Sequence, residues 1–193
     1  MKRMPFLLPL LLIAGLIAPL ASAQHAELGV FGDYTRLTQT KTNMLGLGAR
    51  LGFNVVHPVL FEAQMAYDFD RAFTEGFTTS SGGTLSTANS NVKVLKALFG
   101  PKLQVGGPVK FFVTAKGGFI HFTLSPAAAS GSGAISTIQN LRLNNVDGMF
   151  YPGAGLMASI GPVGLRLDVG DDMYFAGGAH NNFVVQFGPV IHF

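Results

Sequence analysis

Three ionisable residues near the C-terminal end of the chain could carry out acid–base chemistry. Asp171 and Asp172 are adjacent, and His180 follows in the same polar segment. Carboxylates and a histidine can act together as general acid and base in a hydrolase. The sequence has no His-x-Ser-Asn stretch and no matched second pair of aspartates to complete such a site. We therefore predict no catalytic residue and favour structural or solvated roles for these three.

Metal and thiol chemistry have even less support. The chain contains no cysteine, which excludes disulfides, thiolate metal sites and a catalytic thiol. Its five histidines are scattered, without the short spacings typical of metal ligands; they are His25, His57, His121, His180 and His192. We predict no metal and no cofactor.

Most of the other charged residues fall at every second position of short alternating runs, on the face opposite the apolar residues. This set consists of Glu27, Asp33, Arg50, Glu62, Asp68, Lys96, Lys102, Lys116, Arg166, Asp168 and His192. It could line a polar path or a gated pore, or it could fill an interior with paired charges. We favour the second interpretation. The predicted interior network is Arg50, Glu62, Lys96, Lys102, Lys116, Arg166 and Asp168, and we place Arg50, Glu62 and Arg166 at its centre because they lie in mid-strand.

The elements that carry these residues have the period of two that is typical of β-strands. Eight strands are predicted, at about 27–37, 45–55, 59–68, 94–105, 110–119, 148–160, 163–170 and 183–193. Long polar connections at 38–43, 69–91, 123–145 and 171–181 alternate with tight turns at 56–59, 106–109 and 160–163, each of which contains Pro-Val. Long loops on one side and short turns on the other are typical of a transmembrane β-barrel.

The bulk of the two faces indicates which one points inward. An eight-stranded barrel has an interior just wide enough for side chains to fill. The apolar faces are rich in Phe, Leu, Tyr and Met, whereas the opposite faces are dominated by Gly, Ala, Thr and a few long charged residues. We therefore expect the apolar faces to point outward into lipid, and we disfavour a lipocalin-like barrel with an apolar interior. Lys93 and Arg36 are the basic residues in phase with the lipid face, both at loop-proximal strand ends.

Aromatic residues gather near the strand ends on the loop side. We interpret them as an aromatic girdle at the membrane surface. The residues are Phe69, Phe73, Phe77, Phe150, Tyr151, Tyr174 and Phe175.

The N-terminus has the organisation of a secretory signal. Lys2 and Arg3 precede an apolar run that ends in Ala-Ser-Ala before Gln24, so we expect cleavage after Ala23. The domains are then a signal peptide at 1–23 and a barrel at 24–193. Because two of the 13 basic residues lie in the signal, 11 basic residues balance 10 acidic ones in the mature chain, and no basic cluster suggests binding to nucleic acid.

The last strand ends on an aromatic residue. Phe193, Ile191 and Phe187 share one apolar face. We expect this strand to pair with the first strand and to present that face to lipid. The terminal phenylalanine, with the apolar residues in step behind it, resembles the C-terminal signature that the outer-membrane assembly machinery recognises.

Residues 26–193 resemble the OmpA-like and OmpX-like family of eight-stranded outer-membrane β-barrels. The likeness rests on the architecture and on the stretches LGLGARLGFN, LRLDVGDDMY and HNNFVVQFGPVIHF. It implies an all-β, closed, antiparallel, up-and-down transmembrane barrel in the outer membrane of a Gram-negative cell, monomeric, with periplasmic termini and long loops outside. Its expected partners are outer-membrane lipid and, during biogenesis, the barrel assembly machinery.

The function predicted from these features is a structural or surface-interaction role without enzymatic activity. Because several unrelated functions use this barrel, the fold alone does not select one. The main alternative is a narrow, porin-like channel for small or hydrophobic solutes. A barrel-embedded hydrolase and a periplasmic lipocalin-like carrier are the remaining alternatives.

Overall fold

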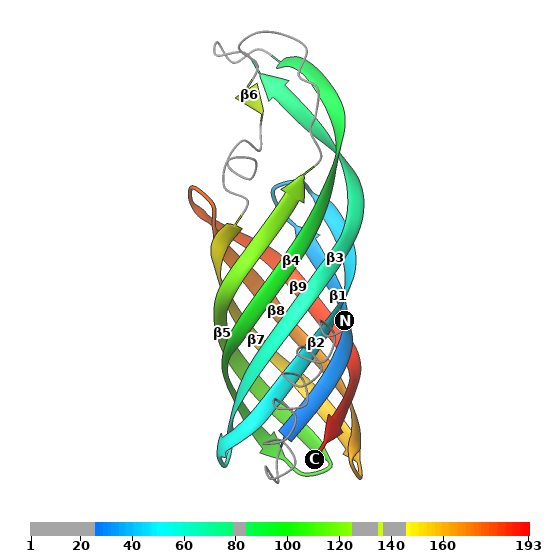
Figure 1. Cartoon of the computed structure of the whole chain (residues 1–193), viewed down its shortest axis with the longest axis vertical. Coiled ribbons are helices and arrows are strands. Elements are labelled where there is room, and N and C mark those ends of the chain that lie inside the picture. Colours follow the sequence, from blue (N-terminus) through cyan, green and yellow to red (C-terminus); the bar gives the residue numbers. More distant parts are fainter. Residues whose placement is uncertain (1–25, 79–83, 125–134, 137–145) are drawn as a thin grey trace, which may run out of the picture.

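A computed structural model of the chain shows a closed β-barrel (Figure 1). The structure describes residues 26–78, 84–124, 135–136 and 146–193, so the expected signal segment, residues 1–23, lies outside the described residues. The strands are β1 (Ala26–Leu37), β2 (Thr42–Val56), β3 (Val59–Thr78), β4 (Thr84–Gly106), β5 (Val109–Leu124), β6 (Ile135–Ser136), β7 (Val146–Ile160), β8 (Val163–Phe175) and β9 (Ala179–His192). In the described part of the chain, no helix is long and apolar enough to cross a membrane.

Eight of these strands form the barrel, and all of their pairings are antiparallel. The hydrogen-bonded order is β2-β1-β9-β8-β7-β5-β4-β3, and the pairing of β2 with β3 closes the ring. The two-residue strand β6 adds only to the outer part of β3. The predicted fold class, a closed eight-stranded antiparallel up-and-down barrel, is confirmed.

The first and last strands close the barrel against each other, as predicted from the apolar end of the chain. Their register runs from Glu27 opposite His192 to Arg36 opposite Phe183. At the end of this seam, the amide of Phe193 donates to the carbonyl of Ala26 at 2.9 Å. Closure removes the unpaired strand edges, which hydrocarbon would not tolerate.

The three predicted tight turns lie together at one end of the barrel, which we call the short-turn end. They join β2 to β3, β4 to β5 and β7 to β8, each across two residues. Gly106 and Gly161 have φ values of 129° and 62° there, a region in which side chains other than glycine are strained. The opposite end is the loop end.

At the loop end, two of the predicted loops are shorter than expected. The segment 69–91 is mostly strand, because β3 continues to Thr78 and β4 begins at Thr84. Residues 171–181 also belong largely to β8 and β9, which leave only 176–178 between them. The polarity of these segments wrongly indicated loops. A strand that extends beyond the membrane needs no apolar face, because its backbone can still pair with a neighbouring strand.

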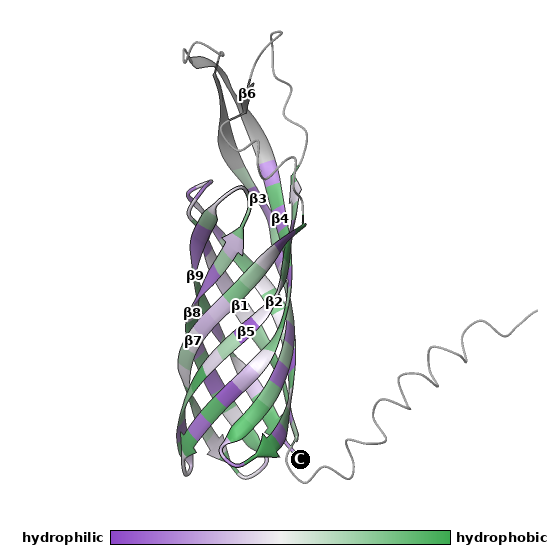
Figure 2. Cartoon of the chain, turned by 90° about the vertical axis from the view of Figure 1, so that its left-hand side faces the viewer, coloured by the Kyte–Doolittle hydropathy of each residue, from purple (hydrophilic) through white to green (hydrophobic). Residues whose placement is uncertain are grey.

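The outer wall of the barrel is apolar, as predicted. Hydrophobic and hydrophilic residues alternate along the strands in Figure 2, and the large apolar side chains point outward. Leu47, Phe99, Phe111 and Phe187 are each more than half exposed, at 62%, 59%, 61% and 55%. A surface this apolar requires lipid, so the lipocalin-like alternative is wrong.

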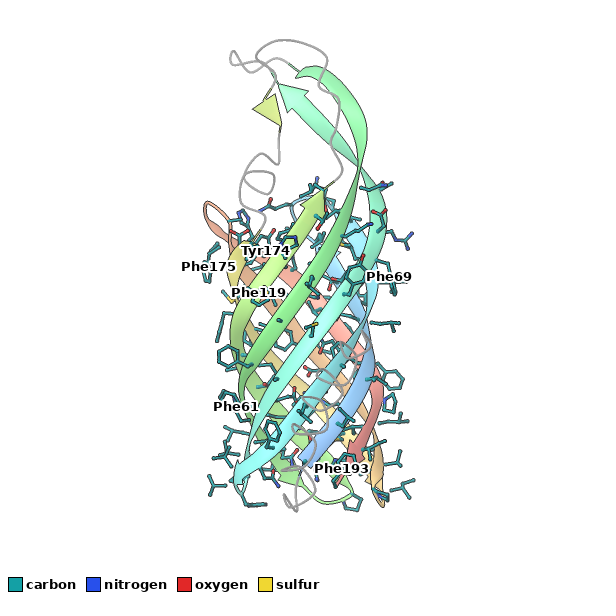
Figure 3. The ribbon with its side chains drawn as sticks, viewed as in Figure 1. Phe61, Phe69, Phe119, Tyr174, Phe175 and Phe193 are labelled. Carbon is teal, nitrogen blue, oxygen red and sulfur yellow. The ribbon has the colours of Figure 1, made fainter. Side chains whose placement is uncertain are left out.

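Exposed aromatic residues lie near both ends of this wall. Figure 3 places Phe61 and Phe193 near the short-turn end, and Phe69 and Phe175 near the loop end. The prediction for two girdle residues is wrong, because Tyr151 and Tyr174 are buried inside, with exposures of 0% and 1%. Both have the inward parity of their strands. The side chains of Phe73 and Phe77, two other predicted girdle residues, lie outside the described part of the structure.

The interior is less uniformly polar than expected, because bulky apolar side chains share it with the charges. A cluster that includes Val94, Ile120, Phe122 and Tyr174 fills the lumen toward the loop end. Phe112, Met157 and Val190 form a smaller cluster toward the short-turn end.

Inward-facing glycines make room for the interior aromatic rings. A Cβ atom on Gly48 would lie 2.3 Å from the ring of Phe31, and one on Gly155 would lie 2.4 Å from the ring of Phe112. The small residues of the inner faces thus lie beneath aromatic rings as well as charges. Large side chains from other strands fill the space that these inward-facing glycines leave.

The outer wall allows a test of how deeply each strand lies in the membrane. Ala115 and Thr123 both point outward from β5, Ala115 in mid-strand and Thr123 at the loop end. We expect Ala115→Arg to lower the free energy of unfolding by about 2–4 kcal/mol in lipid, and Thr123→Arg by about 0–1 kcal/mol, because the cost of a lipid-facing charge depends on depth. Urea unfolding in phospholipid vesicles measures both. Equal costs at the two positions would contradict the assigned membrane span.

Candidate functional site

The structure places all seven residues of the predicted network inside the barrel. Their exposures are 4% for Arg50, 1% for Glu62, 2% for Lys96, 0% for Lys102, 0% for Lys116, 1% for Arg166 and 0% for Asp168. They come from five strands, β2, β3, β4, β5 and β8. The alternating pattern of each strand points these side chains toward the barrel axis.

Glu62 is the centre of the first group of interior charges, which we call the Glu62 cluster: Glu62, Arg166, Lys116, Lys102 and Asp168. Arg166 donates to Glu62 through both terminal nitrogens, the second bond measuring 3.3 Å. The ammonium of Lys116 lies 2.5 Å from Glu62 Oε1, and that of Lys102 lies 3.5 Å from Oε2. One carboxylate therefore faces three cations.

Within the Glu62 cluster, Asp168 makes the contact to Arg50, the third residue that the sequence places at the centre of the network. Its carboxylate accepts from Arg166 at 2.7 Å and from Arg50 at 3.3 Å. The Tyr151 hydroxyl donates to the other oxygen at 2.9 Å. Arg50 also donates to Gln186 Oε1 at 3.3 Å. Arg50 and Glu62 are thus bridged through Asp168 and Arg166 and do not contact each other directly.

Aromatic rings cover the two interior guanidinium groups. Arg50 lies 4.1 Å above the ring of Phe31, and Arg166 lies 4.1 Å above the ring of Phe112. The face of an aromatic ring attracts a cation, and the attraction is stronger where water is excluded. The rings therefore hold the arginines in place and close the lumen around them.

A second group of charges, the Lys96 cluster, consists of Lys96, Asp33, Asp68, Asp172 and Thr35. The Lys96 ammonium lies 2.5 Å from Asp33, 3.3 Å from Asp68 and 3.1 Å from Asp172. It also donates to the Thr35 hydroxyl at 2.8 Å. Here one cation faces three carboxylates, the reverse of the arrangement at Glu62.

Asp172 was expected in the last surface loop and is instead an interior residue with 1% exposure. It shares the inward parity of Arg166 and Asp168 on β8, which continues to Phe175. Gln64, Gln186 and Tyr151 are also missing from the predicted network. Gln64 accepts from Lys116 at 2.5 Å. All four have the inward parity of their strands, which is a signal for uncharged polar residues as well as for charged ones.

The interior holds charges of both signs that are shielded from water. Five cations accompany seven carboxylates: the cations are Arg50, Lys96, Lys102, Lys116 and Arg166, and the carboxylates are Glu27, Asp33, Glu62, Asp68, Asp147, Asp168 and Asp172. Buried charges must be paired, because an isolated charge in a low-dielectric interior is very costly. Exposures of 0–1% at Glu62, Lys102 and Lys116 show that a water-sized sphere does not reach the middle of the lumen.

A polar recess of about 220 Å³ opens at the short-turn end. It is lined by residues that include Glu27, Gln104, Lys110 and His192. Lys102 donates to Glu27 at the inner side of this recess, and His192 Nε2 lies 3.6 Å from Glu27 Oε1. The recess therefore ends at an ion pair and an aromatic ring, since Lys102 lies 5.6 Å from the ring of Phe112.

The residues considered for acid–base chemistry do not converge on a site. Asp172 is held by Lys96, Asp171 accepts from the Asn181 amide at 2.7 Å, and His180 Nε2 lies 3.2 Å from the carbonyl of Ala176. Within the described ranges, no group of three or more His, Cys, Asp or Glu residues is placed to hold a metal ion. The arrangement fills and stabilises a barrel.

A closed eight-stranded barrel with an apolar outer wall and a filled, charged interior has the architecture of a small outer-membrane β-barrel protein. The comparisons with solved structures support this class. No family model and no curated protein matches the sequence.

Three solved structures share the fold. The N-terminal β-barrel domain of OprF from Pseudomonas aeruginosa has a TM-score of 0.52 and 11% identity, covering 88% of this chain and 98% of that one. Neisserial surface protein A has a TM-score of 0.51 and 10% identity, covering 88% and 96%. A major outer membrane protein from Thermus thermophilus has a TM-score of 0.50 and 12% identity, covering 87% and 99%. At such low identities the likeness shows the fold alone.

Proposed function

We propose that this protein is a non-enzymatic barrel of the outer membrane that presents a β-ribbon at the cell surface for interaction with other proteins. The ribbon is the part of β3 and β4 beyond the barrel, residues 71–78 and 84–92. The barrel lies in the membrane as a monomer, with the short-turn end and both termini in the periplasm. The apolar wall, the resemblance to outer-membrane barrels and the meeting of the first and last described residues, Ala26 and Phe193, at the short-turn end support this orientation.

The observation that carries the proposal is the length of the ribbon. β3 and β4 rise beyond the ends of the other barrel strands in Figure 1, and their pairing continues from Arg71 opposite Val92 to Thr78 opposite Thr84. Between β4 and β5 the pairing begins only at Val92, so within the described residues the segment 84–91 pairs with β3 alone. Such an open edge can accept an extended segment of another protein as an additional strand.

The outer part of β3 already accepts one short strand. Phe77 and Thr78 pair with Ser136 and Ile135 of β6. The ribbon can therefore be extended through backbone hydrogen bonds. These bonds require a partner with an extended backbone but place little restriction on its sequence.

The filled interior argues against the alternative of a channel. A conducting pore needs a continuous aqueous path, and the Glu62 cluster crosses the lumen in side chains that water does not reach. We expect no steady conductance from the purified protein in planar bilayers. Discrete, long-lived channels would favour the porin-like alternative.

The assembly signal also remains a proposal. Phe193, Ile191 and Phe187 point outward from β9 and are exposed at 61%, 43% and 55%. Their outward orientation on the seam strand supports a role as the signal that the assembly machinery binds. In the closed barrel, the same three side chains are expected to contact lipid.

A ribbon-shortened variant tests the surface-interaction role. Deleting residues 74–89 removes most of the ribbon and leaves the barrel pairings of β3 and β4 intact. Both forms, in lipid nanodiscs, would be used to select from a phage library of ten-residue peptides. We expect the full chain to enrich peptides in which apolar and polar residues alternate, as in a β-strand. The enrichment of these peptides on the shortened chain should be at least tenfold lower.

Heat-modifiability on unboiled gels would verify that both forms contain a folded barrel. A proline placed within an enriched peptide should abolish its binding, because proline removes a backbone donor. Equal enrichment on both forms, or none on the full chain, would contradict a docking role for the ribbon.

A further inference from the structure

The polar recess at the short-turn end contains polar groups that the barrel itself does not use. Polar side chains from six strands line it: Glu27 of β1, Asn54 of β2, Gln104 of β4, Lys110 of β5, Ser159 of β7 and His192 of β9. Its inner end is closed by the ion pair of Lys102 with Glu27. The polar recess is therefore a pocket that opens toward the short-turn end and does not continue through the lumen.

Lys110 is a cation of the polar recess without a counter-ion. Its side chain is half-buried and has the inward parity of Phe112 and Thr114 on β5. It forms no ion pair with a carboxylate of the described residues, and Glu27 is already paired with Lys102. Buried lysines are usually paired with an opposite charge. The ammonium of Lys110 can therefore bind an anion that enters the pocket.

Three other side chains of the polar recess lack hydrogen-bond partners within the described structure. The unpartnered atoms are Ser159 Oγ, Gln104 Oε1 and both ring nitrogens of His192. Leaving buried polar atoms unpaired is costly, so such atoms indicate a missing partner. Because Ser159 and Gln104 line the pocket, rotations of the hydroxyl and of the amide would direct them toward a bound molecule. That molecule would need hydrogen-bond acceptors and at least one donor.

The charges of the surrounding interior favour an anion at this end of the barrel. From the polar recess to the level of Asp168, five inward cations accompany three carboxylates: Lys110, Lys102, Lys116, Arg166 and Arg50, with Glu27, Glu62 and Asp168. Toward the loop end the balance reverses, and among the buried residues described there Lys96 accompanies four carboxylates: Asp33, Asp68, Asp147 and Asp172. An anion is therefore attracted to the short-turn end of the lumen and repelled from the loop end.

We propose that the polar recess binds a small monocarboxylate that also carries a hydroxyl or amide group. The ligand carboxylate would accept from Lys110 and Ser159, and its donor group would bind Gln104. One negative charge matches the one unpaired ammonium of the pocket, whereas a phosphate dianion would place a second charge beside Glu27. This site is independent of the surface role proposed for the ribbon.

The size of the pocket limits the size of the ligand. The polar recess has a volume of about 220 Å³, whereas a cavity of roughly 150 Å³ is large enough for benzene. A ligand of roughly six to ten non-hydrogen atoms therefore fits. Both a free organic acid and the C-terminal carboxylate of a peptide have this chemistry.

NMR titration of the isotope-labelled full chain in neutral detergent micelles tests this proposal. The probes are N-acetylalanine and its carboxamide, which has the same shape but no charge. We expect N-acetylalanine to shift the backbone signals of Gln104, Lys110, Ser159 and His192. The carboxamide should bind about ten- to a hundredfold more weakly, because hydrogen bonds between charged groups are the stronger ones.

Four variants locate the binding site. Lys110→Gln should weaken the binding of N-acetylalanine about ten- to a hundredfold, whereas Lys110→Arg should retain most of it. Ser159→Leu leaves the ammonium in place but fills the pocket, and should abolish binding. Lys93→Gln removes a lysine at the loop end and should retain wild-type affinity. Heat-modifiability of each variant separates loss of binding from loss of fold.

Four results would overturn the proposal. Equal affinity of the wild type for the acid and the carboxamide would show that the carboxylate is not recognised. Unchanged affinity of Lys110→Gln would show that the ligand lies elsewhere. Full competition by chloride at the concentration of N-acetylalanine would show a nonspecific anion site. Tighter binding of inorganic phosphate than of N-acetylalanine would contradict the choice of a monocarboxylate.

A longer probe distinguishes the two sources of the carboxylate. Binding of the peptide Gly-Gly-Gly-Ala as tightly as N-acetylalanine would support the site and identify the end of a peptide chain as its ligand. Loss of binding on this extension would support the site with a free organic acid as its ligand.

Discussion

Glu62→Gln is expected to lower the free energy of unfolding by about 3–5 kcal/mol, because removing one partner leaves buried charges uncompensated. Glu62 faces the cations of Arg166, Lys116 and Lys102. Glutamine keeps the volume of the side chain and one acceptor oxygen but removes the negative charge. Most of the loss therefore reflects the unpaired cations, with little contribution from a cavity.

Urea unfolding in vesicles, followed by the gel shift of the folded band, would measure this effect. Asp70→Asn is the matched control, because Asp70 is an exposed carboxylate on the same strand. Its loss should change stability by less than about 0.5 kcal/mol, as for most surface substitutions. A similar small effect for Glu62→Gln would show that the interior cations find water or other partners, and that the lumen is open.

Lys96→Met is expected to have a comparable cost, about 3–5 kcal/mol at neutral pH, for the opposite electrostatic reason. Without the ammonium, Asp33, Asp68 and Asp172 would be left as three carboxylates in one buried site. Like charges that close together cannot all remain ionised without a large penalty. The variant should therefore take up protons in this cluster, and its deficit relative to wild type should shrink at mildly acidic pH.

The sign of this pH effect distinguishes charge from packing. Protonation removes the repulsion among the carboxylates, so acid should narrow the difference in unfolding free energy between variant and wild type. A lost packing contact would give a deficit that does not change with pH. Lys93→Met, three residues earlier on the same strand but outside the barrel, is the control and should show neither the deficit nor the pH dependence.

The interior charges form two groups with opposite arrangements. The Glu62 cluster has an excess of cations around one carboxylate, and the Lys96 cluster has an excess of carboxylates around one cation. Each centre is the residue whose removal leaves the most like charges together. Removing a peripheral partner such as Lys116 should cost less, because Glu62 keeps the cations of Arg166 and Lys102.

Much of this protein could be predicted from the sequence because the β-strand period is simple and two-valued. Once one face of a strand is known to be apolar, every inward residue follows from parity, and Arg50, Glu62 and Arg166 were placed in the interior on that basis. The size of the apolar side chains decided which face pointed outward. The tight turns could also be located, because proline and glycine mark positions where the chain turns and no ladder hydrogen bond is needed.

The alternating pattern did not reveal strands in polar segments, where apolar residues do not mark one face. The polarity of their segment predicts surface positions for Asp172 and Tyr174, yet β8 continues through both, and their side chains lie in the barrel interior. The ribbon of β3 and β4 was missed for the same reason, since strands outside the membrane are not required to alternate.

The sequence by itself thus determined the strands, their two faces, the closed barrel and the identity of most interior charges. Only the tertiary structure decided which charges meet. Glu62 and Arg166 are 104 residues apart and meet because the strand register and the closure of the ring bring β3 and β8 across one narrow lumen. A period of two fixes on which side of a strand a residue lies. Its height along the barrel axis and its neighbour across the lumen depend on the relative shift of all eight strands, which no single strand encodes.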